Sequence, residues 1–478
     1  MPFLFTLPTT SSVLLTDFFA SVTHPSLPLT AATKRTVVKD ALKKHKRLAA
    51  SSRDGHLSTV QDALNAYIPY LLALSIASGY RDVGSDHVDL DFLKPLEAEW
   101  RLTLSHTVPG REAARPKVVG LHNEVAFVFS SLAAVSCLLG RAQIAKLYST
   151  SVLSAEQRMN AIKAAMKYYI HAHNIYAYIL SLPSLSASKD APVDIQPSTI
   201  SALASLALAE ATLTAVLKDD PYATAVADDR NEQNNEWMYK APTISKVRAV
   251  LLARISLAAA EHASQASALI AQSGNGRLDG DLIKYVDSLR RTARGKAARF
   301  LGINTELADQ TGEALAWLKG ARKELGFTNE AEDGKRKGFR GFKQSWQEKR
   351  EDKKAEKGGD WGSDAGRYEE LRIIEMLEAK WDKQNSTINV QAVPAFEPLL
   401  ANMPSGRECH TPQPYQPPKL DRAALLQMRA PPSPSHLAFR GDEDDSGGEE
   451  SRRPGDPVGA FPGAGLEYGG RAPSSTYY

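Results

Sequence analysis

Two glycine-containing stretches carry some of the residues that a phosphate-binding loop requires. Gly274, Gly276 and Gly280 lie close together, but the segment before them has the pattern of a helix, whereas a dinucleotide site needs a strand there. Gly295-Lys296 lacks both the upstream glycine and the following Ser or Thr of a P-loop. The sequence therefore predicts no nucleotide site.

Metal-binding and nucleophilic chemistry are disfavoured on similar grounds. His171 and His173 are two residues apart in a helical pattern, so their side chains point about 200° apart and cannot share a metal ion. Cys137 lies in an apolar stretch that would raise its pKa, and the chain has no Gly-x-Ser-x-Gly elbow. Glu124 and Glu210 lie in apolar helical patterns, where a carboxylate is more often paired with Lys or Arg than catalytic. We therefore expect a non-enzymatic chain with no metal and no cofactor.

A binding surface is better supported than a catalytic site. The helix expected over residues 243–272 carries two parallel stripes at helical spacing. The first stripe, which has the character of core, contains Ile244, Leu251, Ile255 and Ala258. The second mixes apolar and charged residues and contains Thr243, Val247, Val250 and Arg254. Half-buried packing and a groove wall that receives a partner helix explain the second stripe equally well. The helix expected over 198–218 has a shallow face that would form the other wall, made of Ala204, Leu208, Ala211 and Ala215.

Two basic segments are candidates for contact with a membrane surface. The first is an amphipathic helix expected over residues 30–47. The second interleaves basic and aromatic side chains, namely Lys335, Arg336, Lys337, Phe339, Arg340, Phe342, Lys343 and Trp346. Basic charge beside an aromatic face is typical of binding to anionic membranes. A solvated helix face and a flexible insertion are the simpler explanations of the two segments, so a peripheral membrane protein is the alternative function and not the first one.

The candidate surfaces belong to a chain that is helical almost throughout. The stretch from Leu121 to Tyr148 is apolar around its circumference, which predicts a helix buried on all sides, and its unbroken apolar run is too short to cross a bilayer. The string from Gly312 to Leu325 resembles a tetratricopeptide-type helix. Further helices are expected over 62–76, 154–182, 282–300 and 368–380, and short strands over 3–7 and 97–105.

Composition and charge narrow the class of protein. At 478 residues, with a net charge of +3, the chain lacks the basic excess of a nucleic-acid binder. Two cysteines give no disulfide framework, and the N-terminus lacks the basic region of a signal peptide, so we expect a cytoplasmic protein. Late in the chain Pro, Gly and the acidic run Asp442–Asp445 become frequent. We therefore predict one domain over residues 1–408 and a disordered tail over 409–478.

A motif in the middle of the chain resembles the BRO domain of Alix and its relatives. It consists of Asp194-Ile195-x-Pro197-x-Thr199-Ile200, followed by Leu203 and Leu208-Ala209-x-Ala211. The apolar helix before it, the aromatic pair Tyr168-Tyr169 and the segment Ile244 to Val247 follow the order that this family uses, over about residues 1–408. The strings at 1–10, 298–306, 312–327 and 392–408 are similar to a fungal branch of the family that serves ambient-pH signalling.

The resemblance implies both a fold and a role. The fold is an elongated, banana-shaped, mainly α-helical BRO domain with a tetratricopeptide-like centre and a few short strands. The role is that of an adaptor in ambient (alkaline) pH signalling, which binds the C-terminal helix of the ESCRT-III subunit of the Vps-thirty-two type. It would position the complex in which a pH-responsive transcription factor is activated by proteolysis. The expected partners include other components of that pathway but no nucleic acid, and the expected location is the cytoplasm, with recruitment to the plasma-membrane cortex or endosomes.

The resemblance also implies which residues hold the partner. Apolar residues on two helices bind the partner helix in this family, and they map onto Ala215, Thr243, Lys246 and Val247, with Val250 beside them. Relatives have a bulky aromatic residue where this chain has Ala215 and a branched aliphatic one where it has Thr243. Each lost apolar anchor is expected to weaken binding by about 1–2 kcal/mol.

Overall fold

A computed structural model describes residues 2–84, 86–106, 112–148, 153–183, 191–223, 225, 242–273, 277–327 and 362–431. The chain divides into one compact unit that ends at Arg429 and a second unit over Ala430–Tyr478. All the described helices and strands belong to the first unit, which is called the helical unit below.

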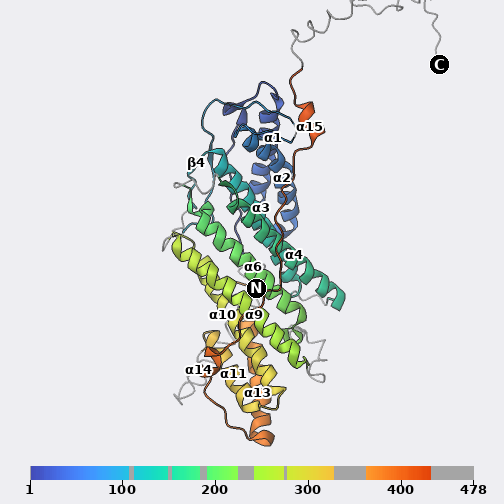
Figure 1. Cartoon of the computed structure of the whole chain (residues 1–478), viewed down its shortest axis with the longest axis vertical. Coiled ribbons are helices and arrows are strands. Elements are labelled where there is room, and N and C mark those ends of the chain that lie inside the picture. The colour runs from blue at the N-terminus through green and yellow to red at the C-terminus, as the bar shows by residue number, and fades with distance from the viewer. Residues whose placement is uncertain are drawn as a thin grey trace, which may run out of the picture. The chain divides into compact units, whose positions relative to one another are not determined.

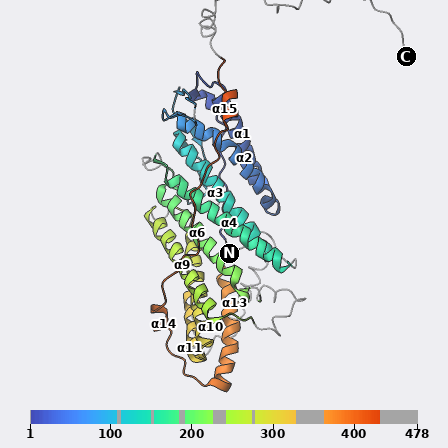
Figure 2. The same cartoon turned by 45° about the vertical axis from the view of Figure 1, so that its right-hand side comes forward.

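Long helices make up most of the helical unit (Figure 1). They are α1 (Ser26–Arg47), α2 (Ala50–Ala77), α3 (Leu121–Lys146), α4 (Ala155–Leu180), α6 (Pro197–Asp219), α9 (Lys246–Gln272), α10 (Gly280–Glu306), α11 (Thr311–Glu324) and α13 (Arg367–Gln384). Each packs against the next one in chain order, and Figures 1 and 2 show them stacked in that order from α1 to α13. Short helices α14 (Glu397–Ala401) and α15 (Arg422–Gln427) follow α13.

Short strands and turns lie in the connections between the long helices. Strand β1 (Phe19–Ala20) pairs with β2 (Asp91–Phe92), and β3 (Glu97–Glu99) pairs with β4 (Lys117–Val119), both antiparallel. The turns are the 3-10 segments η1 (Leu15–Asp17) and η2 (Val193–Ile195) and the π-helical turn η3 (Asn385–Asn389). The prediction of a strand over residues 97–105 is confirmed only for 97–99.

The prediction of a strand over residues 3–7 is wrong. This segment forms no ladder with another strand. One of its backbone amides bonds to a side chain instead, because the Phe3 N–H donates to Glu210 Oε1 at 3.0 Å. Phe3 and Phe5 alternate as a strand would, but both pack into the helical core, where Phe3 contacts Tyr285 with 5.2 Å between ring centroids.

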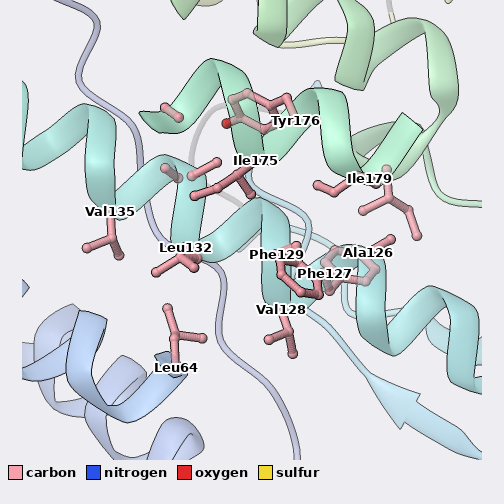
Figure 3. Packing of buried hydrophobic residues seen from close by; sticks show 14 of the residues in the cluster. Leu64, Ala126, Phe127, Val128, Phe129, Leu132, Val135, Ile175, Tyr176 and Ile179 are labelled. Carbon is pink, nitrogen blue, oxygen red and sulfur yellow. The ribbon is translucent and has the colours of Figure 1, made fainter. Parts of the chain in front are cut away.

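The helix expected to be buried on all sides is α3. Phe129, Leu132 and Val135 have no exposed surface. Figure 3 shows the two faces of this helix, which pack against Leu64 of α2 on one side and against Ile175, Tyr176 and Ile179 of α4 on the other. Both α3 and α6 are long and apolar enough to cross a membrane, but 83% and 78% of these stretches are buried inside the protein. Each is therefore accounted for as a core helix.

A buried ion pair fastens α1 to α3. Arg35 Nε donates to Glu124 Oε1 at 2.8 Å, and the Trp100 indole N–H donates to Glu124 Oε2 at 2.7 Å. Arg35 also donates to the Thr10 hydroxyl at 2.7 Å. A buried charge is tolerated when it is paired and hydrogen-bonded in this way. The prediction that Glu124 is paired with a basic residue is confirmed.

A second buried network fastens the end of α6 to α10 and α13. Arg299 pairs with both Asp220 and Glu370, and Lys296 also pairs with Glu370. The arginine holds the pKa of Asp220 below its ordinary value despite burial, which acts in the opposite direction. Because Asp220 directly follows α6, this network fixes where that helix ends.

After α14 the chain returns across the helices as an extended segment. Residues 403–421, called the strap below, have no regular secondary structure and lead to α15. Figures 1 and 2 show the strap as an orange-red trace that runs along the helices from α14 to α15. Tyr415 of the strap packs among Phe129, His171 and Tyr178, with 5.5–6.1 Å between ring centroids. The helical unit thus continues to Arg429, past the boundary expected at residue 408.

Candidate functional site

The second stripe of α9 begins later than the sequence pattern indicates. The helix starts at Lys246, and Ser245 before it has extended backbone. Thr243 therefore precedes the helix and does not continue its stripe. Its side chain is exposed. Val247 is 82% exposed in the first turn, and Val250, one turn further along, is half-buried. The prediction that Ile244, Ile255 and Ala258 are core is confirmed, since each is at most 9% exposed. Leu251, the fourth residue of that stripe, is only partly buried and packs against the edge of the same core.

The facing residues of α6 lie at the same end of the α6–α9 pair. Arg248 of α9 pairs with Asp219 at the end of α6 at 2.7 Å, which ties the last turn of one helix to the first turn of the other. Ala215 is half-buried there, and its neighbour Val216 is fully buried against the core that includes Leu252. The structure thus places Ala215, Thr243, Lys246, Val247 and Val250 at one end of this helix pair, which is called the open end below.

Positive charge surrounds the open end. Lys246 and Lys218 are both exposed, and neither forms an ion pair with another residue in the described part of the chain. The first turn of α9 adds the positive end of a helix dipole. Exposed Val247, next to Lys246, therefore offers an apolar contact beside positive charge that favours an acidic partner.

The strap covers the other half of the expected groove. Arg254, the last residue of the second stripe, donates through Nε to the Ser405 carbonyl at 3.1 Å, and the Arg407 N–H donates back to the Arg254 carbonyl at 3.0 Å. On α6, Ala211 is fully buried, and His410 of the strap lies next to its carbonyl group, which opposes the lowering of the His410 pKa by burial. The two faces that were expected to form one continuous groove are therefore filled by the chain itself over half of their length.

Gly406 explains how closely the strap approaches α9. A Cβ atom on Gly406 would lie 2.8 Å from the Ala258 nitrogen and 2.9 Å from its Cα, which is closer than real Cβ contacts. Only glycine permits this approach of one backbone to another. Two residues could have indicated the strap from the sequence, namely Gly406 and Tyr415, an aromatic residue among prolines. The prediction from composition placed Tyr415 in the disordered tail instead.

The residues first considered for chemistry have structural partners. His171 contacts Tyr415 and lies 3.1 Å from the Ser136 hydroxyl, and His173 lies 2.9 Å from the Ala204 carbonyl, as expected for packing histidines. Burial raises the pKa of the Cys137 thiol well above its ordinary value, which confirms that prediction.

Among the described residues, Glu210 is held by hydrogen bonds from a backbone amide and a hydroxyl group. Its Oε1 accepts hydrogen bonds from the Phe3 N–H at 3.0 Å and the Tyr285 hydroxyl at 2.7 Å. Burial raises the pKa of Glu210 to about 7, against the opposing effect of these two hydrogen bonds. Its carboxyl group therefore joins the N-terminal segment, α6 and α10.

The basic helix α1 has fewer available cations than its sequence indicates. Arg35 is buried against Glu124, Lys39 pairs with Asp40 at 3.3 Å and Lys46 pairs with Glu112 at 2.9 Å. The other basic candidate, residues 335–346, lies outside the described residues.

Comparisons with known proteins find a similar sequence and similar folds. No family model matches the chain. The chain is 39% identical to the pH-response regulator protein palC of Emericella nidulans, over 97% of this chain and 99% of that protein.

Two solved structures have a similar fold. In the complex of the ALIX BRO1 domain with CHMP4C, the ALIX BRO1 fold covers 96% of its chain and 87% of this one, with a TM-score of 0.53 and 16% identity. ALIX bound to the SIVmac239 PYKEVTEDL late domain gives a TM-score of 0.56 at 16% identity, over 92% of this chain and 53% of that one. The prediction of a mainly helical BRO domain with a few short strands is confirmed.

Proposed function

Because the chain belongs to the palC family of pH-response regulators, we propose that it is an adaptor of ambient-pH signalling that binds an ESCRT-III helix at its open end. The chain is a non-enzymatic member of this pathway, in agreement with the sequence-based expectation. Support for the partner comes from the BRO1 fold, which in ALIX has been solved as a complex with CHMP4C. The proposed partner is the ESCRT-III subunit of the Vps-thirty-two type.

The main observation that supports this proposal is the exposure of Val247. A large apolar side chain that is 82% exposed in the first turn of a long helix gains stability only when another surface covers it. Its neighbours Lys246 and Lys218 favour acidic residues beside that surface. An amphipathic helix with one apolar face and acidic flanks satisfies both requirements.

Binding of this helix would bring the chain to the membrane on which the partner assembles. We propose the plasma-membrane cortex or endosomes as that location, where the chain would help to position the signalling complex for proteolytic activation of the transcription factor. The small side chains at Ala215 and Thr243 are expected to make the contact shallow, since neither supplies the area of a buried anchor.

The proposal is tested by calorimetric titration of the full-length chain with a peptide of the C-terminal helix of the fungal ESCRT-III subunit. The Val247→Asp variant should lose affinity by about tenfold or more, because it places a charge in a contact that becomes desolvated. The matched control is Val37→Asp on α1, where an exposed valine of a different helix receives the same charge. This control should bind like the wild type, and both variants should keep the wild-type unfolding midpoint.

Two results would contradict the proposal. Equal binding by the wild type and a folded Val247→Asp variant would mean that the peptide does not bind at the open end. No binding by the wild-type chain would favour the alternative function, attachment to anionic membrane through basic segments. On α1, the exposed cations Lys44 and Arg47 remain available for that attachment.

A further inference from the structure

A cleft of about 760 Å³ lies between the end of α2, the β1–β2 ribbon and the start of α3. Its lining contains no residue of α6 or α9, so it is separate from the open end. This volume falls within the usual range of ligand sites, roughly 300–1,000 Å³. None of the contacts described above occupies it.

The wall of the cleft is apolar. Phe19 of β1, Leu72 of α2, Leu121 and Val125 of α3, and Leu96 and Leu182 line it. Phe19, Leu96 and Val125 are each at most 3% exposed, so they form a fixed wall continuous with the core. The described lining includes no Asp or Glu side chain.

The lining favours a hydrocarbon chain over a peptide. A buried peptide needs partners for its N–H and C=O groups, and each group left unpaired is costly. Two lining amides are already used, because the Leu93 N–H donates to the Phe18 carbonyl and the Gly120 N–H donates to the Leu96 carbonyl. An acyl chain has no such groups and loses nothing in these surroundings.

Two cations line the cleft near its exposed edge. Arg81 and Lys94 are exposed, and neither forms an ion pair with another described residue. Asp82, the acid next to Arg81 in the chain, lies 3.1 Å from His87, and Glu97 near Lys94 pairs with Lys117. The Lys94 ammonium lies 4.7 Å from the centroid of the Phe18 ring. An anionic group therefore meets unneutralised positive charge at this edge.

Exposed apolar side chains accompany these cations. Phe92 is 52% exposed and Leu93 is 59% exposed, and both line the cleft. Tyr80, next to Arg81 in the chain, is 85% exposed. Aromatic and aliphatic side chains beside basic ones are typical of residues that enter the headgroup region of a bilayer.

We propose that this cleft binds one acyl chain of an anionic phospholipid presented by a membrane, with the phosphate of the lipid between Arg81 and Lys94. The cleft gives the chain a membrane contact of its own, in addition to any contact made through a protein partner. This contact does not depend on binding at the open end.

Sedimentation of the full-length chain with vesicles tests the proposal. The wild type should bind vesicles of phosphatidylcholine with phosphatidylserine and not vesicles of phosphatidylcholine alone. The double variant Arg81→Glu, Lys94→Glu should lose vesicle affinity by about tenfold or more. The matched control is Lys44→Glu, Arg47→Glu on α1, which makes the same change of charge on another exposed surface and should lose much less.

A second variant distinguishes the effect of the cleft on vesicle binding from the effect of surface charge. Ser75→Trp places a large side chain from α2 into the cleft without a change of charge. It should lose vesicle binding and also the fluorescence enhancement of dansyl-undecanoic acid, a single-chain anionic probe that the wild type should bind. Glycerol phosphate, which has a headgroup but no chain, should not displace the probe.

Three results would overturn the proposal. The first is equal loss of vesicle binding in the two charge-reversal variants, and the second is wild-type vesicle binding by a folded Ser75→Trp variant. The third is no vesicle binding by the wild type. If Ser75→Trp does not fold, the comparison of the Arg81→Glu, Lys94→Glu variant with its control still tests the proposal. Both cleft variants should bind the ESCRT-III peptide like the wild type, so failure here is distinct from failure at the open end.

Discussion

Thr243 is the position at which a single side chain is expected to improve partner binding. It is exposed and lies before α9, so a larger side chain there disturbs no core packing. We expect Thr243→Ile to raise affinity for the ESCRT-III helix by about three- to tenfold, because each buried methylene contributes about 0.8 kcal/mol. Calorimetric titration measures this change.

The matched control for that gain is Thr33→Ile, which makes the same substitution at an exposed position of α1. It should leave the affinity unchanged. An unchanged affinity in Thr243→Ile as well would mean that the partner helix does not reach the segment before α9.

Glu210 gives the protein a dependence of stability on pH. Below about pH 4.5 the carboxyl is protonated in both the folded and the unfolded chain, so it contributes no pH dependence. As pH rises from 4.5 to about 7, the unfolded chain releases this proton while the folded chain retains it, and stability falls. Above pH 7 the loss is complete, on the order of 3 kcal/mol.

Glu210→Gln should abolish this pH dependence. The amide keeps an oxygen that can accept from the Phe3 N–H and the Tyr285 hydroxyl, but it does not ionise. Urea unfolding at pH 5 and at pH 7.5 should therefore show that the free energy of unfolding of the variant rises relative to that of the wild type as pH rises. The exposed carboxylate of Glu97 supplies the control, Glu97→Gln, which should show no such gain. A constant difference between Glu210→Gln and the wild type would contradict the assigned cause.

At the scale of elements, the strap depends on one close contact. Gly406→Ala would place a methyl group against the backbone of Ala258, so the strap must move away from α9. We expect the Arg407 amide, which donates to the Arg254 carbonyl, to exchange with deuterium faster, and stability to fall by about 1–3 kcal/mol. Hydrogen exchange followed by mass spectrometry measures the first effect.

Gly280→Ala is the control for the strap, since no atom lies within 4 Å of a Cβ at that glycine. It should not change exchange in the strap. Wild-type exchange in Gly406→Ala would mean that the strap is held by Tyr415 and the rest of its length, and not by this contact.

The elements that could be predicted from the sequence are those with a local signal. The 3.6-residue spacing of apolar residues predicts α3, α4, α6 and α9, because each helix buries a regular pattern of its own side chains. The start of α9 was placed three residues early because the pattern continues through Thr243, although the backbone at Ser245 is extended. Helix ends are set by backbone conformation, which side-chain periodicity does not encode.

The strap could not be predicted from a local signal. It is extended, has no periodicity, and is held by residues distant in sequence, such as Arg254 and Phe129. The candidate site likewise combines a part with a local sequence signal and a part that depends on residues distant in sequence. The helical phase of Val247 left half-buried packing and a groove wall open, and in the structure its side chain is exposed. The coverage of Arg254 depends on Ser405, 151 residues later.

At the scale of the whole helical unit, long-range contacts compensate for packing that is otherwise sequential. Among the described residues, each long helix packs mainly against its neighbours in chain order, so helices far apart in the chain share little direct packing. The strap contacts α9, α6, α4 and α3 in succession, so it reinforces the packing of these consecutive helices and also links α9 with α3. The Arg299 network does the same for α6, α10 and α13.

This role of the strap predicts where the chain can be shortened. A chain ending at residue 408 loses Tyr415 and also Leu425 and Met428 of the α15 region, which are 2% and 8% exposed. Each buried side chain of this kind contributes about 1.5–3 kcal/mol, so we expect the free energy of unfolding to fall by several kcal/mol. A chain ending at residue 431 keeps all three and should unfold in urea at the same concentration as the full-length chain.

Both truncated chains keep every residue of the open end, so the comparison separates stability from binding. The chain ending at 431 should bind the ESCRT-III peptide like the full-length chain. In the chain ending at 408, the strap beyond Glu408 is missing and Ala211 is uncovered, which exposes a second, small-residue stretch of groove beside the open end. If that chain remains as stable as the full-length chain, the strap does not hold the helices together, and its contacts are accessory to a fold that the long helices complete by themselves.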